Sequence, residues 1–136
     1  MLKKLADIAE AYSLGEIYVF GSRAAEIAAY LRGESTGFSY PDSDVDIGLQ
    51  PRRGHRLTAR DKARLMIELE DLLGVRRMDL VSIPEAPPFL ALDIIRGELI
   101  FSADPDEQAE HELYVLRRAG DLVHYERQQR NQILSV

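Results

Sequence analysis

Apolar residues recur along this chain with two different spacings. From Leu2 to Tyr12 they fall every three or four positions, which is the spacing of one face of an α-helix. We expect Gly15 to cap the carboxyl end of that helix. The next apolar run, Ile17 to Phe20, is short, rich in β-branched and aromatic residues and bounded by glycines, so it predicts a buried strand.

Helical and strand patterns continue to alternate along the rest of the chain. We expect Ser22 and Thr58 to cap the amino ends of two helices, Gly74 to end the second of them, and a capping box at residues 104–107 to open a third. The predicted elements are a helix over 23–31, a loop over 33–43, a strand over 45–49, a helix from about 58 to 74, a strand over 78–83, a short helix over 89–95, an edge strand over 99–101 and a final helix over about 105–132.

This order of elements predicts an α/β fold of the α+β kind. A small mixed sheet of three to four strands would pack with helices, and a further helix would follow at the carboxyl end. The 136 residues fit one domain, residues 1–136, and the shares of hydrophobic (46%) and charged (29%) residues are those of a globular protein. The absence of cysteine excludes disulfides, thiolate metal sites and a cysteine nucleophile.

No apolar run approaches the length of a membrane span, and the charged amino terminus does not match a secretory signal. We therefore expect a cytoplasmic protein without a membrane partner.

Charge is unevenly distributed along the chain. The formal net charge of −6 argues against direct nucleic-acid binding by the surface as a whole. Residues 52–64 contain six Lys or Arg and one acid, whereas residues 98–112 contain six acids and no Lys or Arg. We expect these two segments to face different partners. The basic segment has almost no aromatic residues between its cations, which argues against stacking on a single nucleic-acid strand.

Two short motifs carry candidate chemistry. In the first, Gly21 would let the backbone approach a ligand closely, and the Ser22 hydroxyl at the start of a helix could bond a phosphate; alone, such a pair is usually only a turn. In the second, Asp44 and Asp46 lie two positions apart on a strand, so their side chains share a face. Two adjacent carboxylates repel each other unless a cation binds them, and oxygen ligands suit Mg²⁺.

A third carboxylate occupies an unusual position. Asp79 lies inside the apolar strand predicted over 78–83, where burying a charge is costly without a cation or partner. If this strand pairs with the strand over 45–49, Asp79 joins the two other acids. Two metal ions and three acids can activate an attacking hydroxyl and stabilise a leaving pyrophosphate. An EF-hand is excluded because Ile47 and Arg53 occupy the positions of its required glycine and glutamate.

Together these motifs resemble the DNA polymerase β-like nucleotidyltransferases, and among them the minimal nucleotidyltransferases. That family combines a Gly-Ser pair, an Asp-x-Asp pair on the next strand and a third Asp on a later strand, matched here by Gly21, Ser22, Asp44, Asp46 and Asp79. The proline-rich turn, apolar helix and long polar helix that follow resemble the antitoxin of HEPN and minimal nucleotidyltransferase toxin-antitoxin pairs. One departure is the spacer of 21 residues between Ser22 and Asp44, which is longer than usual in the family.

The resemblance implies an enzyme of the protein adenylyltransferase type. It would use two Mg²⁺ ions and transfer AMP from ATP to a tyrosine hydroxyl of a HEPN ribonuclease toxin encoded nearby. The implied roles are catalysis and metal binding for Asp44, Asp46 and Asp79, phosphate binding for Gly21 and Ser22, and added positive charge near the pyrophosphate for Arg23.

Two other functions fit the same fold. The chain could be a catalytically inactive antitoxin that neutralises its partner by binding alone, but a pure binder has no need for three costly carboxylates in one pocket. It could also modify a small molecule such as an aminoglycoside, but such enzymes usually need a further domain to hold the acceptor.

Overall fold

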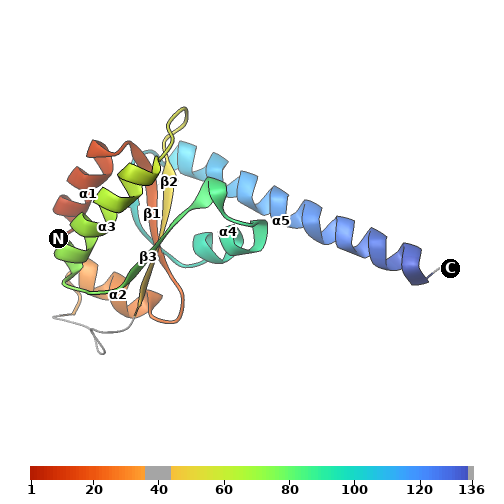
Figure 1. Ribbon diagram of the computed structural model, residues 1–136, viewed down its shortest axis with the longest axis horizontal. Coiled ribbons are helices and arrows are strands. Elements are labelled where there is room, and N and C mark those ends of the chain that lie inside the picture. The colour runs from red at the N-terminus through yellow and green to blue at the C-terminus, as the bar shows by residue number, and fades with distance from the viewer. Residues whose placement is uncertain (36–43, 135–136) are drawn as a thin grey trace.

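A computed structural model describes residues 1–35 and 44–134 (Figure 1). The elements are α1 (Leu2–Ala11), β1 (Leu14–Phe20), α2 (Ala24–Leu31), β2 (Val45–Pro51), α3 (Ala59–Leu73), β3 (Met78–Ser82), a 3-10 turn η1 (Ile83–Glu85), α4 (Pro88–Ile95), β4 (Glu98–Ser102) and α5 (Pro105–Leu134). The predicted order of helices and strands is confirmed. Most of the predicted loop over 33–43 lies outside the described residues.

The strands form one mixed sheet in the order β3-β2-β1-β4. β1 is antiparallel to both of its neighbours, while β2 and β3 are parallel. A parallel pair needs a crossover connection, and α3 supplies it. This arrangement confirms the predicted α+β class and the place of β4 at an edge.

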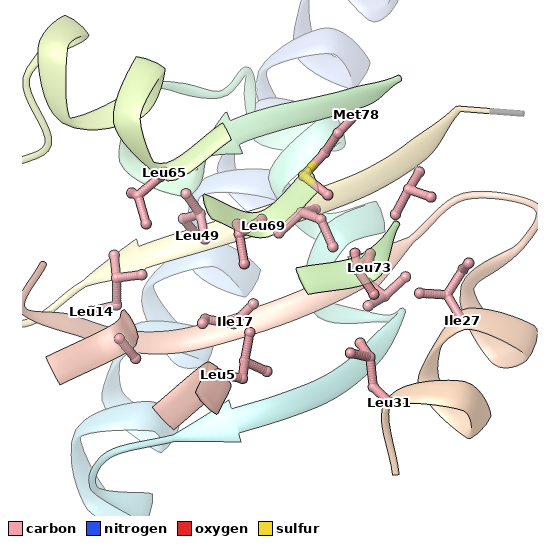
Figure 2. Close-up of a cluster of buried hydrophobic side chains, with 14 of the residues drawn as sticks. Leu5, Leu14, Ile17, Ile27, Leu31, Leu49, Leu65, Leu69, Leu73 and Met78 are labelled. Atoms are coloured by element: carbon pink, nitrogen blue, oxygen red, sulfur yellow. The ribbon is translucent and has the colours of Figure 1, made fainter. Parts of the chain in front are cut away.

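The sheet is covered on both faces. Neighbouring residues of a strand point to opposite faces, so Ile17 and Val19 of β1 meet one core and Tyr18 meets the other. Helices α1, α2 and α3 cover the first face. Their side chains Leu5, Ile27 and Leu65 pack with Ile17 of β1 and Leu49 of β2 (Figure 2). Helices α4 and α5 cover the second face.

The ends of α3 follow the sequence closely. The Thr58 hydroxyl accepts a hydrogen bond from the Asp61 amide at 3.1 Å, and the Asp61 carboxylate accepts one from the Thr58 amide at 2.9 Å. Gly74 ends the helix with a left-handed backbone, at φ 69°. Both predicted caps of α3 are confirmed.

Two other predicted caps are wrong. Helix α1 ends at Ala11, Ser13 makes the turn with φ 53°, and Gly15 lies inside β1. Helix α2 begins at Ala24, with Arg23 as its N-cap residue and no side-chain cap. Ser22 therefore precedes the helix by a further residue. At the end of α1, Gly15 is not a cap because β1 already pairs with β2 from Leu14 onward. At the start of α2, Arg23 takes the N-cap position one residue after Ser22.

The start of α5 joins the two charged segments to each other. The Asp104 carboxylate caps the helix by accepting from the Asp106 amide at 2.9 Å. Glu107, the expected second half of a capping box, instead accepts from the Arg53 amide at 2.6 Å and from the Arg52 guanidinium at 3.0 Å. The prediction that the basic and acidic segments face different partners is therefore wrong for these residues, which neutralise one another.

Buried polar contacts attach α5 to the sheet. Glu16 of β1 is 1% exposed, and one of its carboxylate oxygens lies 2.7 Å from His111 Nδ1. The hydroxyl of Tyr18, also 1% exposed, donates to Glu112 at 2.7 Å. Burial raises the pKa of both Glu16 and Tyr18. Beyond this attachment, α5 extends away from the sheet (Figure 1). Among the helices of residues 1–35 and 44–134, none has the length and hydropathy of a membrane span.

We expect Tyr18→Phe to lower the free energy of unfolding by about 1–2 kcal/mol, because it removes a buried hydrogen bond to a charged group. Urea unfolding followed by circular dichroism measures the change. Tyr125→Phe is the matched control, since Tyr125 on α5 is 58% exposed, and this variant should unfold like the wild type. Equal stability of all three proteins would contradict a stabilising role for the contact between Tyr18 and Glu112.

Candidate active site

The sheet brings the predicted site residues to one of its ends. β1 is antiparallel to β2, so the end of β1 meets the beginning of β2, and Phe20 pairs with Asp46. β2 is parallel to β3, so both strands begin at the same end, and Asp46 pairs with Asp79. The strand of Asp79 thus pairs with the strand of Asp46, which is the condition under which Asp79 was expected to join the other acids. Gly21 follows β1 directly, and Asp44 precedes β2.

Gly21 and Asp46 are in close contact. Gly21 has φ +84°, and a Cβ atom at this position would lie 2.5 Å from Oδ2 of Asp46. A side chain here would be strained by the backbone and would also push the carboxylate aside. Only glycine allows the backbone after β1 to pass this close to Asp46.

Negative charge accumulates at this end of the sheet. Asp46 is partly buried, and burial raises the pKa of its carboxyl; the charges of Asp79 and Asp44 raise that pKa further. Asp44 and Asp79 are exposed, so Asp79 does not bear the burial cost that the sequence suggested. The three acids repel one another, and such a group gains stability when a cation binds to it.

The carboxylate oxygens of these acids fit a hard cation such as Mg²⁺. Asp46 and Asp79 are paired across neighbouring strands, and Asp44, two positions before Asp46, is on the same face of the sheet. Within residues 1–35 and 44–134, however, no three His, Asp or Glu side chains are gathered into a cluster that could already hold a metal ion. The fit therefore rests on the donor types and on their repulsion, and a bound cation would draw the carboxylates together.

The remaining predicted residues lie in the turn between β1 and α2. The Ala24 amide donates to the Gly21 carbonyl oxygen at 3.2 Å, which closes this turn around Ser22 and Arg23. Ser22 is exposed and precedes α2, so its hydroxyl is free of a capping role. Arg23 Nε lies 3.7 Å from the Glu26 carboxylate. The turn thus presents a hydroxyl and the amino end of a helix beside the acids, which favours a bound anion.

A cavity of about 740 Å³ lies away from these residues. It is lined by residues that include Leu14 at the start of β1 and Arg52 after the end of β2. These positions mark the opposite end of the sheet from Gly21 and Asp46. This cavity is therefore not the candidate active site, which lies at the strand ends where Ser22, Asp44 and Asp79 are exposed.

Sequence reasoning missed Arg77, which immediately precedes β3. The Val45 amide donates to the Arg77 carbonyl oxygen at 3.2 Å, so this arginine lies at the same end of the sheet as the three acids. The sequence does show that Arg77 is two residues before Asp79. Only the register between β2 and β3, however, shows that this position is also near Asp44 and Asp46.

Comparison with known proteins agrees with this geometry. The family model described as Polymerase beta, Nucleotidyltransferase matches residues 3–106. A solved minimal nucleotidyltransferase is 31% identical, with a TM-score of 0.50, over 71% of this chain and 85% of its own. No curated protein sequence matches.

The fold is also that of solved toxin-antitoxin complexes. One, solved with AMP-PNP, has a TM-score of 0.65 at 19% identity, over 99% of this chain and 98% of that chain. Another, from Shewanella oneidensis, contains a tri-AMPylated HEPN toxin with its MNT antitoxin and has a TM-score of 0.60 at 18% identity, over 98% of this chain and 93% of that chain. The family match over residues 3–106 and the arrangement of Gly21, Asp46 and Asp79 lead to one assignment: this chain belongs to the DNA polymerase β-like nucleotidyltransferase family.

Proposed function

We propose that this chain is a Mg²⁺-dependent adenylyltransferase that transfers AMP from ATP to a tyrosine hydroxyl of a HEPN toxin, and so acts as the antitoxin of a toxin-antitoxin pair. The observation that carries the proposal is the pairing of Asp46 with Asp79 beside Gly21. Family membership supports nucleotidyl transfer, and the complexes that share the fold support the choice of partner.

Each site residue has a role in this reaction. Asp44, Asp46 and Asp79 would hold Mg²⁺, which when bound stabilises negative charge on the phosphates. The Gly21 backbone and the Ser22 hydroxyl would hold phosphate oxygens, and Arg23 would add positive charge near the leaving group.

The transfer itself exchanges one bond for another at phosphorus. The tyrosine oxygen forms a bond to the α-phosphorus of ATP, and the bond from that phosphorus to the bridging oxygen breaks, so pyrophosphate leaves. The proton of the tyrosine hydroxyl passes to the carboxylate of Asp79, which acts as general base. Asp44 and Asp79 are exposed, so a hydroxyl presented by a partner protein can reach them.

Transfer of label from ATP tests this function. We expect the HEPN protein encoded beside this chain to gain radioactivity when both proteins are incubated with Mg²⁺ and ATP labelled at the α-phosphate. ATP labelled at the γ-phosphate is the matched control and should give none, because that phosphate leaves in pyrophosphate. Labelling from the γ-phosphate alone would indicate phosphorylation instead, and no labelling from either would rule out the enzyme.

The same proteins test neutralisation by binding alone. If the toxin ribonuclease is inhibited without ATP and Mg²⁺ as strongly as with them, the chain acts as a binding module and the proposed transfer is not how it neutralises the toxin.

A further inference from the structure

We propose that Arg77 is a phosphate-binding residue of this site and that its guanidinium holds the polyphosphate of the nucleotide on the β3 side of the three acids. This inference rests on the proposed function and adds a residue to it that none of the predicted motifs contains.

The register of the sheet places Arg77 with the acids. Val45 pairs with Met78 in the parallel ladder, and the Val45 amide donates to the Arg77 carbonyl oxygen. Continued by one residue, this register places Arg77 opposite Asp44. Val45 and Met78 are both buried in the core beneath α1, α2 and α3. Since side chains alternate along extended backbone, Arg77 is on the face opposite to that core, which is also the face of Asp46 and Asp79.

The positively charged side chain of Arg77 is also available to bind a ligand. It is exposed, and within the described residues its side chain makes no hydrogen bond or ion pair. Two arginines near other acids are engaged, since Arg52 binds Glu107 at 3.0 Å and Arg32 lies 3.5 Å from Glu98. Arg77 lies at the same end of the sheet as the three acids but forms no ion pair with them, so its guanidinium can bind a ligand there.

The chemistry of a guanidinium suits this place. A planar guanidinium donates two parallel hydrogen bonds to phosphate oxygens. The acids bind the nucleotide only through a cation, while Ser22 and Arg23 lie on the β1 side of Asp46. Arg77 supplies direct positive charge on the β3 side, so the polyphosphate would be held from both sides of the metal-binding carboxylates.

Binding of a nucleotide that cannot react tests the inference apart from catalysis. Isothermal titration with Mg²⁺ and α,β-methylene ATP gives the Kd of the wild type, Arg77→Ala and Arg76→Ala. Arg76 is the matched control: it is the same residue type, is also exposed, and lies at a bend outside the paired segment. We expect Arg77→Ala to raise Kd about tenfold, the loss of a charge-assisted contact, and Arg76→Ala to stay within about twofold.

Inorganic pyrophosphate distinguishes phosphate binding from binding of the adenosine part. As a competitor with Mg²⁺, it should displace the analogue from the wild type about tenfold more effectively than from Arg77→Ala. Unchanged analogue binding by Arg77→Ala, or equal weakening by both alanine variants, would overturn the role of Arg77 and leave the proposed function intact. Failure of the wild type to bind the analogue would overturn both.

Discussion

Asp46→Asn is expected to abolish AMP transfer to the partner protein. Asp46 is the acid in contact with Gly21 on one side and paired with Asp79 on the other, so it is central to any metal bound here. Replacing its carboxylate by an amide removes a charged ligand while keeping the shape of the side chain. A loss of about 4 kcal/mol of transition-state stabilisation corresponds to a rate about a thousandfold lower. Transfer of α-labelled phosphate under single-turnover conditions measures it.

The stability of this variant separates lost chemistry from lost folding. Burial and the charges of Asp79 and Asp44 disfavour the ionised Asp46, so the amide relieves repulsion. Asp46→Asn should therefore unfold at the same temperature as the wild type or a higher one. Asp121→Asn, an exposed position on α5, is the matched control and should keep full activity. Transfer by Asp46→Asn within about tenfold of the wild type would contradict a metal-binding role for this residue.

The elements of the fold could be predicted from the sequence because the local signals were strong. The stripe of Leu65, Leu69 and Leu73 together with the Thr58 cap determines α3, since both depend only on residues close in the chain. The caps assigned to Gly15 and Ser22 were wrong because a glycine or serine near a helix end fits several turn geometries. Gly15 lies in β1 because that strand pairs with β2 from Leu14 onward.

The residues of the candidate site could be predicted from the sequence, but the contacts between them could not. Alternation along a strand predicted that Asp44 and Asp46 share a face, but only the register of β2 with β3 shows that Asp46 pairs with Asp79. A contact between residues distant in the chain also explains why the predicted role of Glu107 differs from the observed one. Glu107 was assigned to a local cap, whereas it accepts hydrogen bonds from Arg52 and Arg53, more than fifty residues away.

Gly21→Ala is expected to reduce AMP transfer about a hundredfold while leaving the protein folded. The new methyl group would lie 2.5 Å from Oδ2 of Asp46, closer than atoms can approach, and the end of the Asp46 side chain is the part that can move. A displacement of about 1 Å at a catalytic group costs about this much in rate. The backbone at φ +84° adds strain of about 1–2 kcal/mol, which lowers the free energy of unfolding.

Gly54→Ala separates the strain from the displacement. Gly54 has nearly the same backbone angle, φ +81°, but nothing lies within 4 Å of a Cβ atom there. Both variants should lose about 1–2 kcal/mol in urea unfolding, because both place an alanine in left-handed backbone. Only Gly21→Ala should lose activity, since only there does the methyl group meet a carboxylate. Equal transfer rates for the two variants would mean that the contact between Gly21 and Asp46 does not position the acid. The close approach of β1 to β2 would then have a structural role and no role in catalysis.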